Sequence, residues 1–284
     1  MKLGFNLLLW TPHVTAAHEA ILKDLKKTGY DGVEIPMFEG DPAHYAKVGE
    51  MLDRIGLERS VVSVLGPGCN PLSPDKVQQK AAVERAKWVI DCSVALGAPI
   101  IGGPMHSEHG YFSGAPATAA ERKRALSFHR KAGDYAARKN VRFALEALNR
   151  FELYFLNTME QLSAYVEEVD HPAIKAMYDT FHANIEEKDP VAAIKTIRPY
   201  MIHVHISEND RGTPGKGHVP WAETFKALRK AKYDGWLTIE AFGRALPPLA
   251  AATRVWRDFA PNYEEVYKFG FKTMTQGWGF GVLN

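Results

Sequence analysis

The feature that most constrains the fold is an alternation, along the whole chain, of short apolar runs with longer segments of helical periodicity. Most of the short runs are apolar throughout, which is typical of strands buried on both faces of a parallel sheet. We therefore expect eight strands, and they cover residues 3–9, 32–36, 60–65, 99–103, 141–147, 174–178, 201–206 and 236–241.

Between these runs lie segments in which apolar residues recur every three or four positions, as on the buried face of a helix. They cover residues 16–28, 45–55, 74–96, 118–139, 158–169, 190–197 and 221–231. Helix-start signals support them, since Thr118 stands three residues before Glu121 and Pro190 follows Asp189. Each unit is therefore a strand followed by a helix.

Two architectures use this alternation. Successive right-handed strand–helix units close naturally into a barrel, although an open, doubly wound sheet has the same pattern. A length of 284 residues suits one barrel. We predict an α/β fold, a single (β/α)8 TIM barrel domain over residues 1–284, with a Gly- and aromatic-rich C-terminal tail from about residue 276.

Composition excludes several classes of partner. The formal charge is only +2 and no long run of like charges occurs, so neither nucleic acid nor an anionic membrane surface is expected as a partner. Two cysteines cannot form a disulfide framework, which favours the reducing cytoplasm. The first apolar stretch, residues 7–10, is too short for a signal or membrane segment. The expected partner is a small molecule.

Polar residues stand at or near the ends of the last four predicted strands. In an α/β barrel, reacting groups sit at the carboxyl ends of strands. The four residues, separated by 33, 26 and 35 positions, are Glu146, Asp179, His205 and Glu240. Because neighbouring strands lie roughly 5 Å apart, these side chains can converge on one ion. Three carboxylates and an imidazole suit Mn²⁺, Mg²⁺ or Co²⁺ better than a structural zinc.

Each of these residues has an ordinary structural alternative. Taken alone, an acidic residue at a strand end is more often a helix cap or a surface ion-pair partner. His203 is expected to be a hydrogen-bonded core residue rather than a ligand, and Glu34 lies nearer the middle of its strand. The occurrence of four such residues on consecutive strands is what indicates a site.

Four segments carry a resemblance to a known family: residues 145–152, 178–187, 203–212 and 239–242. With them, nearly the whole chain resembles the ketose 3-epimerases, the group of D-tagatose, D-psicose (D-allulose) and L-ribulose 3-epimerases in the xylose-isomerase-like barrel superfamily. By this resemblance the metal ligands are Glu146, Asp179, His205 and Glu240, and the two acid/base residues are Glu146 and Glu240. The matching substrate contacts are Glu152, His182 and Arg211.

The pocket for the far end of the sugar is expected to involve Leu8, Gly66, Phe242 and the loop of residues 106–112. The resemblance implies inversion of carbon 3 of a free ketose through a cis-enediolate, with one divalent ion, Mn²⁺ before Co²⁺ or Mg²⁺. It also implies a homodimer or homotetramer.

Other functions use the same barrel. Hydroxypyruvate isomerase, or another sugar isomerase or dehydratase of the superfamily, shares much of this chemistry, and a non-catalytic sugar-binding protein is a more distant alternative. A metal-dependent endonuclease would need more histidines at strand ends and a basic groove. The Gly- and Pro-rich loop of residues 209–220 is expected to form a wall or a lid, and it matches no phosphate-binding motif.

Overall fold

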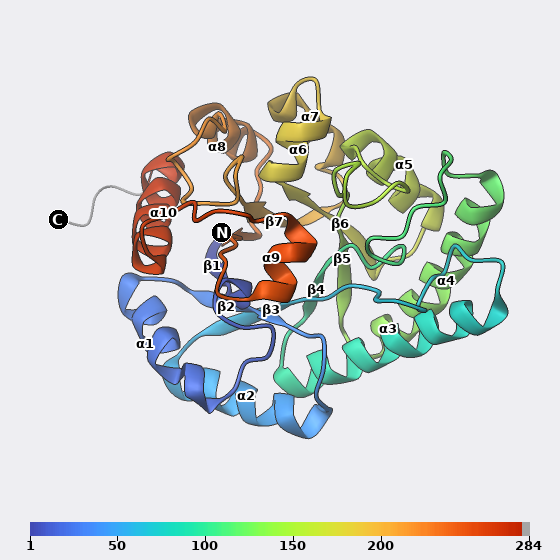
Figure 1. Ribbon diagram of the computed structural model, residues 1–284, viewed down its shortest axis with the longest axis horizontal. Helices are drawn as coiled ribbons and strands as arrows, with labels where there is room; N and C mark the ends of the chain where they lie inside the picture. Colours follow the sequence, from blue (N-terminus) through green and yellow to red (C-terminus); the bar gives the residue numbers. More distant parts are fainter. Residues whose placement is uncertain (280–284) are drawn as a thin grey trace.

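The computed structural model describes residues 1–279 and shows eight parallel strands closed into a barrel in chain order (Figure 1). The predicted barrel is confirmed, and the open doubly wound sheet is excluded. The strands are β1 (Lys2–Asn6), β2 (Gly32–Pro36), β3 (Glu58–Val62), β4 (Ile100–Gly103), β5 (Arg142–Leu145), β6 (Ile174–Asp179), β7 (Met201–Ile206) and β8 (Trp236–Ile239).

Strand β1 ends earlier than the expected run of residues 3–9. The side chain of Asn6 accepts a hydrogen bond from the amide of Leu8 at 2.9 Å, which caps a short 3-10 helix, η1 (Leu7–Leu9). Strands β5 and β8 are also shorter than expected. Glu146 and Glu240 therefore follow their strands instead of lying within them.

The helices expected between the strands are confirmed, with shifts of one to three residues at their ends. They are η2 (Ala16–His18) continuing into α1 (Glu19–Thr28), α2 (Pro42–Ile55), α3 (Lys76–Leu96), α4 (Ala119–Arg138), α5 (Met159–Val169), α7 (Pro190–Ile197) and α8 (Trp221–Lys230). Thr118 and Glu121 form the expected capping box, and Asp189 caps α7.

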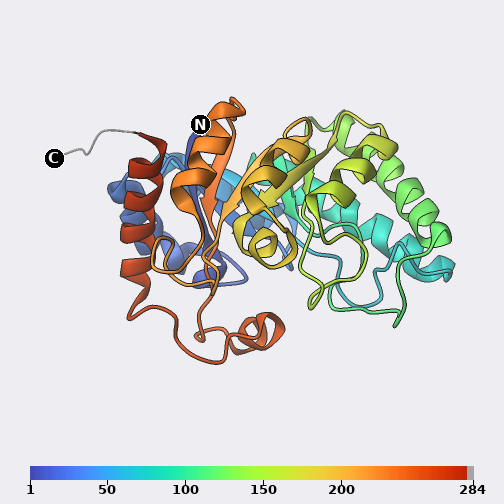
Figure 2. The same cartoon turned by 90° about the horizontal axis from the view of Figure 1, so that it is seen from above.

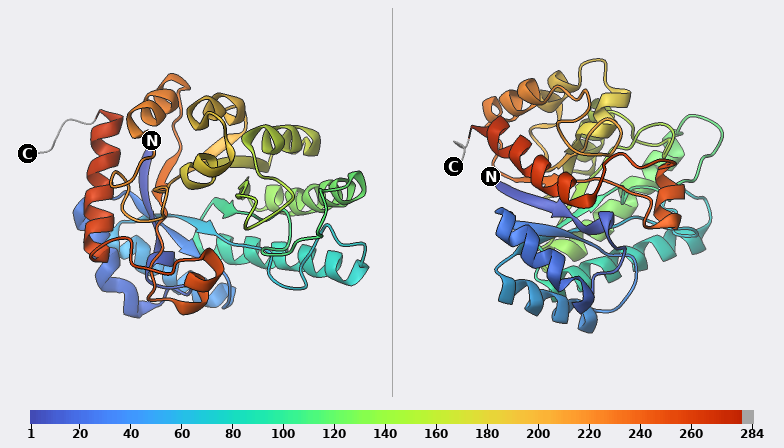
Figure 3. Two further views of the ribbon diagram at one scale, coloured as in Figure 1. Left: turned by 45° about the horizontal axis from the view of Figure 1, so that its top comes forward. Right: turned by 60° about the vertical axis from the view of Figure 1, so that its left-hand side comes forward.

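Three further helices were not expected: α6 (Thr180–Glu186), α9 (Pro247–Thr253) and α10 (Tyr263–Trp278). Helix α10 lies between α8 and α1 and completes the outer ring (Figures 1 and 3). Gly270 allows this close packing, since a Cβ there would lie 2.5 Å from Ile239 Cδ1. The tail was therefore placed too early, because residues 276–278 are helical; residues 280–284 lie outside the described part of the chain.

Helix α9 stands away from the barrel wall, on the side toward which the loops after β4 and β5 also extend (Figure 2). That side is the carboxyl end of the strands, where the predicted site residues lie. Within residues 1–279, no helix has the length and apolar character needed to span a membrane.

A buried histidine on helix α4, His129, should make the stability of the protein depend on pH. His129 on α4 is buried, and its Nδ1 lies 2.6 Å from the Tyr165 hydroxyl. Burial lowers the pKa of His129 to about 3. Above pH 6.5 this histidine is neutral in both the folded and the unfolded protein. Below pH 6.5 it binds a proton in the unfolded protein but stays neutral in the folded protein, so the free energy of unfolding falls as the pH falls toward 3.

We expect this histidine to contribute a loss of about 1.4 kcal/mol in unfolding free energy per pH unit between pH 6 and 4. The variant His129→Gln, which can still accept a hydrogen bond from Tyr165, should remove that part of the slope in urea unfolding at several pH values. The exposed His218→Gln is the control and should keep the slope. Equal slopes in wild type and His129→Gln would contradict the prediction.

Candidate active site

The four predicted ligands meet inside the carboxyl end of the barrel. Asp179 ends β6 and His205 lies opposite it in β7, while Glu146 and Glu240 come directly after β5 and β8. All four are buried, and each offers a ligand atom within 4.8 Å of the others. The prediction that these side chains converge is confirmed.

His205 lies at the centre of this cluster. Its Nδ1 is 3.4 Å from Asp179 Oδ2, 3.5 Å from Glu240 Oε1 and 3.7 Å from Glu146 Oε1. Neither His205 Nδ1 nor Glu146 Oε1 has a hydrogen-bond partner among the described residues, although both are buried. Unpaired buried polar atoms are costly, so two of them directed at one point fit a bound cation.

The carboxylates repel one another in this enclosed space. Burial raises the pKa of Glu146 to about 8, with further contributions from Glu240 and Asp179, while His205 opposes the shift. The pKa of Glu240 is also raised, again mainly by burial. A divalent ion among them would favour their charged forms, and the donor set of three carboxylates and one imidazole suits such an ion.

Asp179 is held differently. Burial alone would raise its pKa, but His182, His205 and Arg211 lower it below the usual range. Its Oδ1 accepts hydrogen bonds from the amides of Phe181 and His182, at 2.6 and 3.1 Å, and so caps helix α6. One carboxylate thus begins a helix and offers its second oxygen to the cluster.

The three predicted substrate contacts lie together beside this cluster. Arg211 donates a hydrogen bond to Glu240, and its Nη2 lies 3.0 Å from His182 Nε2 and 3.5 Å from Glu152 Oε1. The guanidinium stacks between Phe181 and Phe242, with its carbon 4.1 and 4.5 Å from the ring centroids. Arg211 is therefore fixed in place.

His182 is held as a neutral ring. Burial lowers its pKa to about 4, while the charges of Asp179 and Glu152 oppose the shift. Its Nδ1 accepts the backbone N–H of Asn149 at 3.0 Å, and its Nε2 lies 3.0 Å from Arg211 Nη2 and 3.7 Å from Glu146 Oε1. Nε2 therefore faces the site, where it can contact a ligand oxygen.

A cavity of about 190 Å³ opens beside these residues. Its polar side is formed by Glu146, Glu152, His182, Arg211 and Glu240, with His109 beside them. Its apolar side is formed by Leu8, Phe38, Val62, Val64, Pro104, Leu148, Phe242, Leu249 and Ala252. One wall can thus bind polar oxygens while the other excludes water.

The expected far-end residues divide into two groups in this cavity. Leu8 and Phe242 line it, whereas Gly66 is not among its lining residues. In the expected loop of residues 106–112, His109 lines the cavity and His106 is buried, its Nε2 2.8 Å from the backbone oxygen of Glu146. Any role for Gly66 in binding stays a prediction.

Some residues of the site were not expected from the sequence. Asn149 binds His182 through its backbone amide and Glu152 through its side chain, at 2.8 Å. Asn149 lies three residues after Glu146, just beyond the end of a strand, and this position could have indicated that it belongs to the site. Leu249, Ala252 and Thr253 reach the cavity only because α9 folds over it, and no local pattern indicates that.

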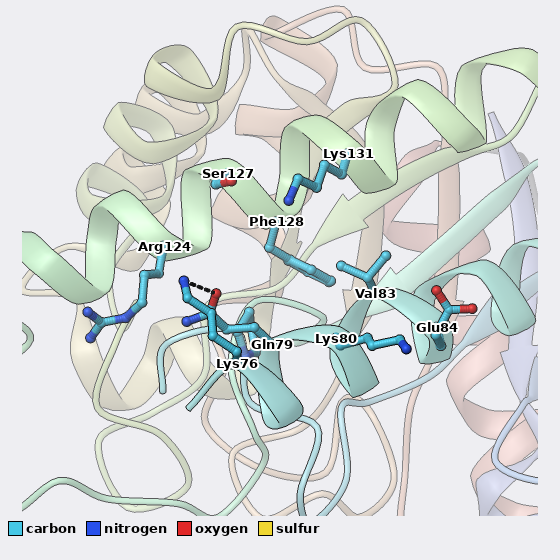
Figure 4. Close-up of a pocket in the computed structure, with 10 residues that line it drawn as sticks. Lys76, Gln79, Lys80, Val83, Glu84, Arg124, Ser127, Phe128 and Lys131 are labelled. Atoms are coloured by element: carbon cyan, nitrogen blue, oxygen red, sulfur yellow. Dashed lines mark hydrogen bonds between the residues drawn. The ribbon is translucent and has the colours of Figure 1, made fainter. Parts of the chain in front are cut away.

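A second hollow lies elsewhere, in a groove between α3 and α4 on the outside of the barrel (Figure 4). Its polar lining is mostly cationic: Lys76, Lys80, Arg124 and Lys131, with Glu84. Its lining contains neither a carboxylate pair nor a histidine, and it shares no residue with the strand-end cavity. The strand-end cavity is therefore the candidate site.

Comparisons with known proteins show the family to which this chain belongs. Residues 22–259 match the family described as xylose isomerase-like TIM barrel. The chain is 30% identical to a probable ketose 3-epimerase of Synechocystis, covering 97% of this chain and 96% of the relative. It is 32% identical to a ketose 3-epimerase of Arthrobacter globiformis, with 94% and 93% covered. The chain belongs to this ketose 3-epimerase family. It is an isomerase.

Solved structures of the family share the fold over nearly the whole chain. D-allulose 3-epimerase from Methylomonas in complex with D-allulose superposes with a TM-score of 0.90 at 27% identity, covering 97% of this chain and 96% of the other. D-psicose 3-epimerase from Clostridium cellulolyticum with D-tagatose gives 0.88 at 27%, covering 98% of each chain.

One buried side chain, that of Glu208, fixes the loop of residues 209–220. This loop carries Arg211. Glu208 accepts hydrogen bonds from the amides of Asn209, Gly215 and Val219 and from the indole of Trp221, at 2.7 to 3.1 Å. These bonds hold Arg211 at a positive φ of 62°. Of the two expected roles for this loop, the bonds favour a fixed wall of the site over a mobile lid.

Replacing this carboxylate should loosen the wall. In Glu208→Gln a single carbonyl oxygen replaces two acceptors, which leaves buried N–H groups unpaired and costs about 1–3 kcal/mol in unfolding free energy. We expect faster amide hydrogen exchange across residues 209–220 than in wild type. Glu223→Gln, on the exposed first turn of α8, is the control. Unchanged amide hydrogen exchange in Glu208→Gln would show that Glu208 does not fix this loop.

Proposed function

We propose that this chain is a metal-dependent ketose 3-epimerase that inverts carbon 3 of a free ketose of the D-tagatose, D-psicose/D-fructose or L-ribulose type. The observation that carries the proposal is the pair Glu146 and Glu240. Both are buried carboxylates that line one cavity, and they come from β5 and β8, with β6 and β7 between them. Two bases from different sides of a pocket suit an inversion.

The reaction needs a proton removed from carbon 3, which is only weakly acidic beside the ketone. One glutamate takes this proton, and the substrate passes through a cis-enediolate. The other glutamate returns a proton from the opposite face, so the configuration inverts. A site with a single base would return the proton to the same face.

The residues proposed to hold the ion are Glu146, Asp179, His205 and Glu240. The unpaired His205 Nδ1 and Glu146 Oε1 support this assignment. When bound, a divalent ion supplies positive charge that stabilises the negative charge developing on the ketose oxygens. Mn²⁺ is the first ion to test, and Co²⁺ and Mg²⁺ are the alternatives.

The remaining polar residues are proposed to bind the substrate. Arg211 and His182 would hold the oxygens on carbons 1 and 2, and Glu152 would orient a hydroxyl group. Leu8 and Phe242 would contact the far end of the sugar. Homologous epimerases with D-allulose or D-tagatose bound support a free sugar as substrate. A homodimer or homotetramer in the cytoplasm completes the proposal.

The direct test is turnover in ²H₂O. Metal-loaded protein is incubated with D-fructose, D-tagatose, D-psicose and L-ribulose, and with hydroxypyruvate as a three-carbon alternative. We expect a 3-epimer that carries deuterium at carbon 3, because the proton exchanges with solvent through the carboxyl groups. Turnover of hydroxypyruvate alone would replace the proposal with the isomerase alternative.

The two glutamates should each be essential. Glu240→Gln and Glu146→Gln remove a base without changing side-chain volume, and we expect kcat to fall by at least about 10²- to 10⁴-fold. Bound metal is measured in each variant, so that lost catalysis is separated from lost ion. The exposed Glu223→Gln is the control. An active Glu240→Gln or Glu146→Gln would refute the two-base mechanism.

A further inference from the structure

A third buried glutamate lies inside the barrel, behind the four-residue cluster. Glu34 is in the middle of β2 and fully buried. Its Oε2 accepts a hydrogen bond from Asn6 Nδ2 at 2.9 Å and lies 2.7 Å from His205 Nε2. Strands β2 and β7 are not neighbours in the barrel, so this contact crosses its interior.

The other carboxylate oxygen of Glu34 is surrounded in the same way. Oε1 accepts the Ser60 hydroxyl at 3.1 Å and lies 2.9 Å from His203 Nε2. Oε2 therefore accepts hydrogen bonds from Asn6 and His205, and Oε1 accepts one from Ser60, whereas the close contact with His203 is not a hydrogen bond. Donors from β1, β3 and β7 thus hold this carboxylate in place.

This arrangement determines which nitrogen of His205 faces the cluster. A carboxylate only accepts hydrogen bonds, so in the neutral ring that a metal ligand requires, the His205 proton lies on Nε2, directed at Glu34. Nδ1 then carries the lone pair, and it is this atom that lies 3.4 to 3.7 Å from the three carboxylates of the cluster. Histidines that bind metals commonly donate their second N–H to a carboxylate in this way.

We infer that Glu34 is a positioning residue that fixes the ring and tautomer of His205 so that Nδ1 is presented to the metal. Asn6 extends the same role to a second ligand, because its Nδ2 donates to both Glu34 and Glu240, at 2.9 and 3.1 Å. The inference rests on the proposed function only in taking the four-residue cluster as the metal site.

The same residues could be taken for a second metal site, since Glu34, His203 and His205 also place donor atoms within 4.8 Å of one another. The donors around Glu34 argue against it. Asn6 and Ser60 both give hydrogen bonds to the carboxylate, and the contact of 2.7 Å with His205 is a normal hydrogen-bond length. A positioning role uses every one of these contacts.

The test is metal affinity, measured on the full chain. Glu34→Gln removes the charge while keeping side-chain volume, and Glu121→Gln is the control, a glutamate on α4 that accepts three hydrogen bonds and does not touch the cluster. After chelation, each protein is titrated with Mn²⁺. We expect Glu34→Gln to weaken binding by about 10- to 100-fold and Glu121→Gln to keep the wild-type Kd.

A spectroscopic readout separates positioning from general damage. In ¹⁵N-labelled histidine spectra of the Mg²⁺-loaded protein, His205 should show a protonated Nε2 and an unprotonated Nδ1 in wild type and Glu121→Gln, and lose this state in Glu34→Gln. Thermal unfolding without metal checks that each variant folds. Should Glu34→Gln not fold, Glu34→Asp, which keeps the charge but shortens the reach, should weaken Mn²⁺ binding by about 10-fold.

Three results would overturn the inference: an unchanged Mn²⁺ affinity in the folded Glu34 variant, equal losses in the Glu34 and Glu121 variants, or two Mn²⁺ ions in wild type with one lost in Glu34→Gln. Failure of the wild type to epimerise any ketose would leave this titration unaffected, because it measures binding alone. The two proposals therefore fail separately.

Discussion

The rest of the site depends on keeping three carboxylates close together in a buried space. Glu146, Asp179 and Glu240 all lie within reach of His205, where water cannot screen their repulsion. Burial and mutual repulsion raise the pKa of Glu146 and Glu240, whereas His182, His205 and Arg211 lower that of Asp179. Positive charge among these carboxylates favours their charged forms, and a divalent ion would supply it.

Several side chains of the barrel both stabilise the local fold and position the groups of the site. Asp179 both caps α6 and faces the cluster, so the helix that carries His182 is fixed to the site. Glu208 ties down the loop that carries Arg211 and holds its backbone at a positive φ. Polar groups are thus oriented before any ligand binds, which is the condition for efficient catalysis in a buried pocket.

Much of this was readable from the sequence, because strand ends in a parallel barrel all point to one face. The apolar runs that end beside Glu146 and Asp179 place those carboxylates at strand ends without knowledge of the fold. The same reasoning failed for Glu34, which was set aside because it lies in mid-strand. Its importance comes from contacts across the barrel, and only closure of the sheet creates them.

The sequence by itself determined the strand–helix order and the four strand-end residues of the candidate site, since each depends on local periodicity and on the spacing of one repeat. Only the tertiary structure decided the rest: that α9 forms part of the pocket, that α10 completes the ring, and that His205 presents Nδ1 rather than Nε2. These features depend on contacts between segments far apart in the chain, and no local pattern of residues encodes them.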